Sequence, residues 1–140
     1  HYRIDTTKGI VDDRAMKDAR KPTDAELTIL RVLWSRAAST VGEVFQALGG
    51  EGAYTTTLKL LQIMTEKGLV RRDDRERTHV YEAASSEDQT QKQIVADLLD
   101  RVFDGSAARL VLQALEARSA SPEEIVEIRK LLDKHRGGRR

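Results

Sequence analysis

The chain has 140 residues, of which 39% are hydrophobic and 34% are charged, and its formal net charge at pH 7 is +1. This length allows one folded domain with a smaller appendage, and the near-neutral charge is not typical of a protein that coats DNA nonspecifically. The lack of cysteine excludes disulfides and thiolate-bound metals. No apolar run approaches the ~20 residues that span a bilayer, so a cytoplasmic protein is expected.

Residues 1–21 contain charges of both signs and isolated apolar residues, with no amphipathic stripe. We expect this segment to be an N-terminal extension or a tag-derived leader, outside the folded part. The folded part is expected to begin with the helix that follows it.

Two helices are predicted next, because each begins with a capping box, in which residues three apart bond each other's backbone amides. Thr23 and Glu26 have this spacing, and so do Thr40 and Glu43. The apolar stripe of the first helix consists of Leu27, Leu30, Leu33 and Trp34. That of the second, before Gly49 and Gly50 end the helix, consists of Val41, Val44, Phe45 and Leu48.

A third helix from Thr55 to Lys67 is predicted from apolar residues at helical spacing and from Gly68, which can adopt the left-handed conformation that ends a helix. Two short strands, 69–72 and 78–81, follow on either side of a charged turn, 73–77. Helix, glycine and basic hairpin in this order are typical of a winged helix, whose helix enters the DNA major groove while the hairpin follows the backbone.

Three further helices are predicted: one from Ser86 to about Val102, one opened by Ser106, and one opened by Ser121 and Pro122. This part is too short to bury three amphipathic helices by itself, so a second copy of the chain is the simplest partner. The fold class is therefore mainly α with a small β-hairpin wing. The predicted divisions are a winged helix-turn-helix domain at 22–84, a helical dimerisation domain at 85–136 and a basic tail at 137–140.

Polar residues at the start of the third helix are candidates for DNA contact, because this end of a recognition helix reaches bases and phosphates. Considered by itself, Thr55 is more simply interpreted as a helix cap and its neighbours as neutral surface residues. The basic hairpin that follows the helix favours the interpretation that these residues contact DNA. The candidates are Thr55, Thr56, Thr57, Lys59 and Gln62.

The hairpin supplies a second candidate cluster, because arginine pairs with phosphate in a two-bonded fork. The residues are Arg71, Arg72, Arg75, Arg77 and His79, and of these Arg75 and Arg77 are favoured because they share one side of the tip. The alternative is a solvated hairpin whose acids and bases pair with each other.

No catalytic or metal site is predicted, and no cofactor is expected. Gly49, Gly50 and Gly52 lack the lysine and the preceding strand of a phosphate-binding loop. Thr56 and Lys59 have the spacing of a nucleophile and its base, but no accompanying motif supports catalysis. The three histidines are scattered, so we do not expect an enzyme.

Apolar residues of the C-terminal helices are predicted to form the dimer interface. They are Ile94, Leu98, Leu99, Val102, Phe103, Leu110, Val111, Leu115, Ile128 and Leu131. A membrane-surface helix is a weak alternative, since the polar faces are not rich in lysine.

From about Pro22 to Lys134 the chain resembles the penicillinase repressor (BlaI/MecI) family of winged-helix regulators. Each matching segment is short, but they occur together, in order and at matching spacing. They are Val32-Leu33-Trp34, Thr40-Val41 before Glu43-Val44, Ala53-Tyr54-Thr55-Thr56, Glu66-Lys67-Gly68-Leu69, Arg77-Thr78-His79-Val80-Tyr81, and Leu99-Asp100-Arg101-Val102-Phe103 before Gly105-Ser106.

The resemblance implies a homodimer that binds a palindromic operator and represses transcription, commonly of β-lactamase or stress-response genes. It places Thr55, Thr56 and Lys59 against the operator, Arg75 and Arg77 on phosphates, and residues 85–134 between the subunits. It also implies release by proteolysis of the C-terminal domain, triggered by a membrane-bound sensor metalloprotease.

Two departures from that family are visible. Its cleavable members are cut at an Asn-Phe bond, and the matching position, the candidate cleavage region, is Gln113-Ala114. Either this switch is absent or the protease has another specificity. The copper-responsive relatives have a cysteine-rich C-terminal motif, which a chain without cysteine cannot form. The alternative from another class is a winged-helix protein–protein interaction module without specific DNA binding.

Overall fold

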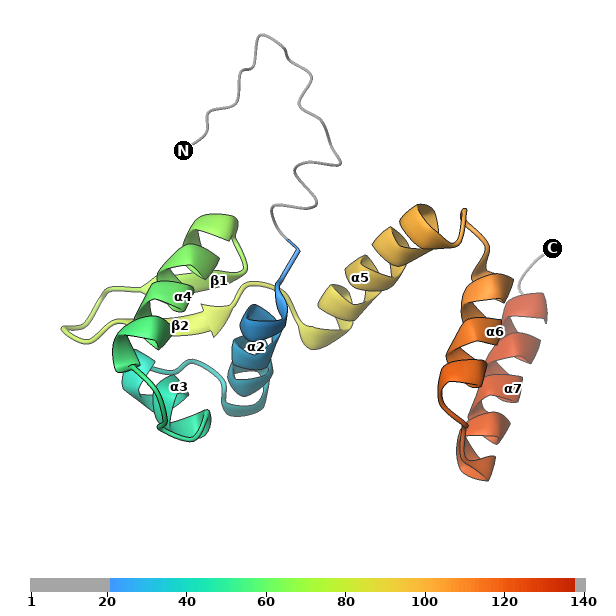
Figure 1. The fold of residues 1–140 in the computed structure, drawn as a ribbon, viewed down its shortest axis with the longest axis horizontal. Coiled ribbons are helices and arrows are strands. Elements are labelled where there is room, and N and C mark those ends of the chain that lie inside the picture. The colour runs from blue at the N-terminus through green and yellow to red at the C-terminus, as the bar shows by residue number, and fades with distance from the viewer. Residues whose placement is uncertain (1–20, 138–140) are drawn as a thin grey trace, which may run out of the picture. The chain divides into compact units, whose positions relative to one another are not determined.

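The computed structural model describes residues 21–137. Figure 1 shows the order α2 (Asp24–Arg36), α3 (Val41–Ala47), α4 (Tyr54–Lys67), β1 (Val70–Asp73), β2 (Val80–Ala83), α5 (Glu87–Val102), α6 (Ala107–Ala117) and α7 (Pro122–Gly137). This confirms the predicted class, mainly helical with one hairpin. The N-terminal extension, apart from Lys21, and the tail beyond Gly137 lie outside the described residues.

The predicted capping boxes are present at the start of α2 and α3. The Thr23 hydroxyl accepts from the Glu26 amide at 3.2 Å, and Glu26 Oε1 accepts from the Thr23 amide at 2.9 Å. Thr40 and Glu43 repeat the pattern at 3.1 and 2.9 Å. Because these bonds join residues only three apart, local sequence suffices to specify where both helices begin.

The hydrophobic core of the N-terminal part of the chain is formed by one face each of α2, α3 and α4, and the hairpin closes it. Its buried apolar residues are Ile29, Leu30, Leu33, Val41, Val44, Leu61, Met64, Val70 and Tyr81. The buried face of α2 is rotated by a fraction of a turn from the apolar stripe that the sequence predicted. Ile29 is buried, whereas Leu27 and Trp34 are only partly buried, and the face runs through positions 26, 29, 30 and 33.

A partly buried ion pair joins the start of α2 to the end of α4. Lys67 Nζ donates to Glu26 Oε1 at 2.7 Å, and the Glu26 side chain is 3% exposed. The same carboxylate oxygen accepts the Thr23 amide. One buried group therefore stabilises both a local cap and a contact between helices distant in sequence.

The hairpin differs from its predicted limits. Its strands pair antiparallel with Asp73 opposite Val80, so the connection runs from 74 to 79 and the second strand begins at Val80, not Thr78. Tyr81 lies opposite Arg72 in this register. Its side chain is buried, and its backbone exchanges hydrogen bonds of 2.8 and 2.9 Å with Ser39, which adds a third short segment to the sheet.

The chain divides into two units between Ile94 and Val95. In the first unit, the Ser86 hydroxyl accepts from the Gln89 amide and opens α5, and Trp34 Nε1 donates to the Ser85 carbonyl at 2.9 Å. In the second, the predicted starts of α6 and α7 are confirmed by Ser106, which accepts from the Arg109 amide, and by Ser121, which exchanges bonds with Glu124.

Candidate nucleic-acid interface

One face of α4 is held in the core while the other meets solvent. Leu61 and Met64 are fully buried, and Gly68, with φ 82°, ends the helix in the left-handed conformation. The candidate residues on the solvent side are Thr55, Thr56, Lys59 and Gln62, and all four are exposed. Lys59 makes no ion pair with any residue that the structure describes. A fixed helix thus presents short hydroxyls, an amide and a free cation.

The start of α4 corrects the reading of Thr55 as a cap. The helix begins at Tyr54, the N-cap position belongs to Ala53, and no side chain caps the helix. Because alanine has no acceptor, the first amides of α4 have no side-chain partner, unlike those of α2 and α3. The Thr56 amide bonds the Ala53 carbonyl at 3.0 Å, and the remaining amides of the first turn, without a side-chain cap, favour an anionic partner.

Thr57 is a second correction. Its side chain is 6% exposed, so it belongs to the interior and is not available to a DNA groove. The reason is helical spacing: Thr57 lies four residues before Leu61 and seven before Met64, on the buried face. That spacing was visible in the sequence.

At the wing, Arg75 is paired with a carboxylate two residues earlier. Its Nε lies 3.0 Å from Asp73 Oδ1 and its Nη2 lies 2.7 Å from Asp73 Oδ2, while its amide also donates to Oδ1 at 3.0 Å. The side-chain bonds from Arg75, followed by its backbone amide, lower the pKa of Asp73 from 3.8 to about 2. The Arg75 side chain is nevertheless 88% exposed.

Three other basic residues of the hairpin also have acidic neighbours. Arg72 Nε lies 2.7 Å from Asp74 Oδ1, and this oxygen lies 3.2 Å from His79 Nδ1, an ion pair when the imidazole is protonated. Arg71 Nε lies 3.3 Å from Glu82 Oε2. The predicted alternative, in which acids and bases of the hairpin pair with each other, therefore describes the unbound wing for Arg71, Arg72 and Arg75.

Arg77 differs from these arginines. It is exposed and makes no ion pair with any residue in the described part of the chain. Of the two favoured wing residues, Arg77 is thus available to phosphate at once, whereas Arg75 must first leave Asp73.

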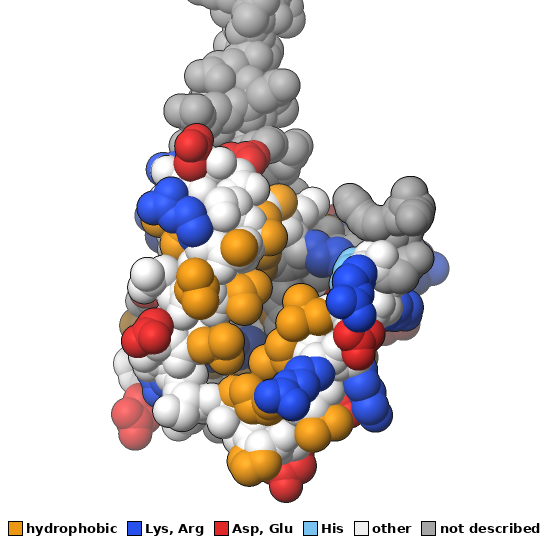
Figure 2. Space-filling view, turned by 90° about the vertical axis from the view of Figure 1, so that its right-hand side faces the viewer, with side chains coloured by type: hydrophobic (Ala, Val, Ile, Leu, Met, Phe, Trp, Pro, Cys, Tyr) orange, Lys and Arg blue, Asp and Glu red, His pale blue; other side chains and the backbone are white. Residues whose placement is uncertain are grey.

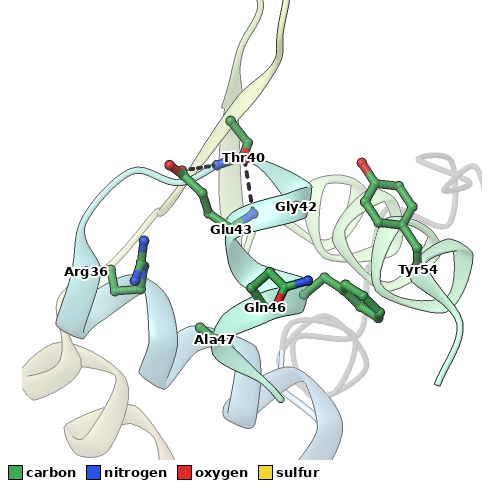
Figure 3. Close-up of a pocket in the computed structure, with 8 residues that line it drawn as sticks. Arg36, Thr40, Gly42, Glu43, Gln46, Ala47 and Tyr54 are labelled. Carbon is green, nitrogen blue, oxygen red and sulfur yellow. Dashed lines mark hydrogen bonds between the residues drawn. The ribbon is translucent and has the colours of Figure 1, made fainter. Parts of the chain in front are cut away.

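An open hollow of about 630 Å³ lies beside the start of α4, lined by Arg36, Thr40, Gly42, Glu43, Phe45, Gln46, Ala47 and Tyr54 (Figure 3). The rings of Phe45 and Tyr54 meet edge to face, with centroids 5.7 Å apart. None of these residues was among the predicted contacts. Tyr54 could have been identified as a candidate site residue from the sequence, because it precedes Thr55 in the first turn of the predicted recognition helix.

The second unit presents its apolar residues to solvent. Of the predicted interface residues in this unit, Leu99, Phe103, Leu110 and Ile128 are half-buried, and Leu98, Val102, Val111, Leu115 and Leu131 are exposed; Ile94, the last residue of the first unit, is half-buried. Prediction missed the exposed Val95, Leu112, Val126 and Leu132. Figure 2, which views the molecule from the side of α6 and α7, shows hydrophobic side chains gathered on the surface.

Gln113 and Ala114, the candidate cleavage region, both lie inside α6 with exposed side chains. Within residues 21–137, no group of three or more histidine or acidic side chains could hold a metal ion. No helix in this range is long and apolar enough to cross a membrane.

Comparison with known proteins identifies a family to which the chain is similar. Residues 22–134 match the family model of the penicillinase repressor. The chain is 27% identical over 123 residues to the penicillinase repressor of Bacillus licheniformis, covering 86% of this chain and 96% of that one.

Two solved structures show partial likeness. One is the homodimeric winged helix-turn-helix DNA-binding domain of a Mycobacterium bovis protein (TM-score 0.49, 21% identity, 75% of this chain and 94% of that one). The other is a MarR family protein from Bacillus stearothermophilus (TM-score 0.49, 25% identity, 89% and 79%). On the family match, the chain belongs to the penicillinase repressor family, a family of transcriptional regulators and not of enzymes.

Proposed function

We propose that this member of the penicillinase repressor family acts in the cytoplasm as a homodimer that occupies a palindromic operator and blocks transcription. The observation that supports DNA binding best is the exposed face of α4, with Thr55, Thr56, Lys59 and Gln62 next to a hairpin of four arginines. Threonine and glutamine can contact base edges, and the arginines phosphates.

The homodimer is supported by the surface of the C-terminal helices. Among the described residues after Thr90 none is buried, and side chains as large as Val102 and Leu112 are 63% and 60% exposed. Several such residues on short helices are a feature of surfaces that another protein covers. The partner is a second copy, because a two-fold axis would present two α4 helices to the two halves of a palindrome.

Two-fold symmetry would place the half-sites about 34–36 Å apart, or at a multiple of this spacing. The regulated genes are proposed to be β-lactamase or stress-response genes, as the family implies. Release is proposed to follow proteolysis of the C-terminal domain by a membrane-bound sensor metalloprotease. Because Gln113 and Ala114 are helical, cleavage there would require local opening of α6.

The test is fluorescence anisotropy with duplex DNA from upstream of the chain's own gene, competed with scrambled DNA, over a series of salt concentrations. Sequence-selective, salt-dependent binding is expected. Thr56→Ala and Lys59→Ala should change the sequence preference. Arg77→Ala should weaken binding to all sequences and reduce the slope of log affinity against log salt concentration by about 1 per wing, because one phosphate contact is lost. Lys130→Ala, on α7, is the control for removing an exposed positive charge.

The second candidate is a protein–protein interaction module without specific DNA binding. The self-paired wing favours it, because an unbound hairpin that neutralises its own arginines has little field to attract DNA. Binding that ignores both sequence and salt in the same titration would replace the repressor reading with this one.

A further inference from the structure

The wing contains as many carboxylates as arginines. Between Val70 and Ala83 there are four of each: Arg71, Arg72, Arg75 and Arg77 against Asp73, Asp74, Glu76 and Glu82. The formal charge of a hairpin proposed to contact phosphates is therefore zero without His79. A hairpin that served only to attract DNA would not need these acids.

Asp73 is placed to imitate a phosphate. Its two oxygens meet two nitrogens of one guanidinium, at 3.0 and 2.7 Å, which is the forked geometry that arginine uses towards phosphate. The Arg75 amide also bonds to Asp73 Oδ1 at 3.0 Å, so the turn itself fixes the carboxylate in place. The Asp73 carboxylate is charged at neutral pH, and its bonds to Arg75 lower its pKa to about 2.

Asp74 has the same relation to Arg72. Its two oxygens accept from Arg72 at 2.7 and 3.2 Å, and Oδ1 also faces His79. Two of the four arginines are thus each held at two points by an aspartate within two residues in the chain.

We infer that Asp73 and Asp74 are specificity-determining residues. Their carboxylates stay paired with the Arg75 and Arg72 guanidinium groups until α4 binds its specific sequence in the groove and a DNA phosphate replaces each carboxylate. This inference rests on the proposed DNA binding. On arbitrary DNA the pairs stay closed, so these arginines release few counterions. On the operator, contacts of α4 hold the wing against the backbone, and phosphate replaces carboxylate.

The change that tests this is Asp73→Asn in the full chain. Asparagine keeps the oxygen that accepts the Arg75 amide but removes the negative charge. Glu76→Gln is the matched control, since it removes one charge from the same hairpin but from a residue with no ion pair to any described residue. Asp73→Asn/Arg75→Gln restores the charge balance, and Asp74→Asn repeats the test on the second pair.

Binding to two duplexes is measured by anisotropy over a salt series: one of random sequence, and one from upstream of the chain's own gene. On random DNA, Asp73→Asn is expected to raise affinity at least about tenfold at 0.1 M salt and to steepen the salt slope by about 0.9 per wing. On the upstream DNA the slope should stay unchanged, because Arg75 already contacts phosphate there. The double variant should lose the gain.

Equal gains for Asp73→Asn and Glu76→Gln would overturn the inference, because general charge would then explain both. So would a gain that survives in the double variant, or unchanged slopes on random DNA for both Asp73→Asn and Asp74→Asn. A wild-type chain that binds neither DNA would instead overturn the proposed function. Thermal melting of each variant, expected within about 2 °C of the wild type, verifies that the hairpin is intact.

Discussion

The winged-helix unit and the C-terminal helices use apolar residues in opposite ways. Every buried apolar side chain in the described part of the chain lies between Ile29 and Tyr81, and each helix of the winged-helix core contributes to that cluster. The C-terminal helices have comparable apolar residues but bury none of them fully. The first unit has the core of an independent fold, whereas the second exposes apolar side chains that the proposed homodimer would cover.

The comparison predicts that changes in the first unit act on folding and changes in the second act on assembly. Folding variants should show effects independent of protein concentration. Assembly variants should show effects that disappear at high concentration, because dissociation follows mass action.

The largest effect is expected from Lys67→Met, which leaves the Glu26 carboxylate buried without its partner. The free energy of unfolding should fall by about 3–5 kcal/mol, measured by urea denaturation. Lys59→Met, on the exposed side of the same helix, is the control and should change it by less than about 0.5 kcal/mol. Similar losses from both variants would show that the pair does not stabilise the unit.

The next effect tests the second unit. Val111→Asp places a charge in the middle of the apolar face of α6 and should convert the proposed dimer to a monomer, with an affinity for the proposed operator about a hundredfold lower, or about 2.7 kcal/mol. Sedimentation measures the assembly, and circular dichroism should still show a folded winged helix. Gln113→Asp, on the polar side of α6, is the control. A monomeric wild-type chain would contradict the comparison.

A smaller change in stability is expected from variants at the helix starts, where α2 and α3 have side-chain caps and α4 has none. Thr40→Ala removes the cap of α3 and should cost about 1 kcal/mol, whereas Ala53→Ser adds the acceptor that α4 lacks and should contribute a few tenths to 1 kcal/mol. Thermal melting measures both changes. If DNA uses the amides in the first turn of α4, which no side chain caps, Ala53→Ser should also weaken operator binding; unchanged binding would show that these amides make no contact.

The smallest effect concerns the wing. Because the folded-state pKa of Asp73 is depressed to about 2 from 3.8, its pair with Arg75 stabilises the fold above pH 4 and is lost as pH falls towards 2. Both groups are exposed, so the change in stability should be small. Titration of the carboxyl by NMR should show this pKa in the wild type and a value near 3.8 in Arg75→Gln. A value near 3.8 in both would mean that the pair does not form in solution.

The starts of α2 and α3, the end of α4 and the family followed from sequence alone. Thr23 with Glu26, Thr40 with Glu43, and Gly68 act within three or four residues, so their roles are readable without a fold. The family resemblance depended on short motifs in a fixed order, and the match over residues 22–134 confirms it. Local interactions and their spacing are properties of the chain itself.

Tertiary structure decided which side of each element is buried and which charges are paired. The buried face of α2 includes Glu26 and Ile29 instead of Leu27 and Trp34, and the Glu26 carboxylate is paired with Lys67, which lies 41 positions later in the chain. Arg75 and Asp73 were both visible in the sequence, but a hairpin of that composition can pair its charges in several ways. The strand register decides one of these pairings, because it places Arg71 opposite Glu82 across the hairpin.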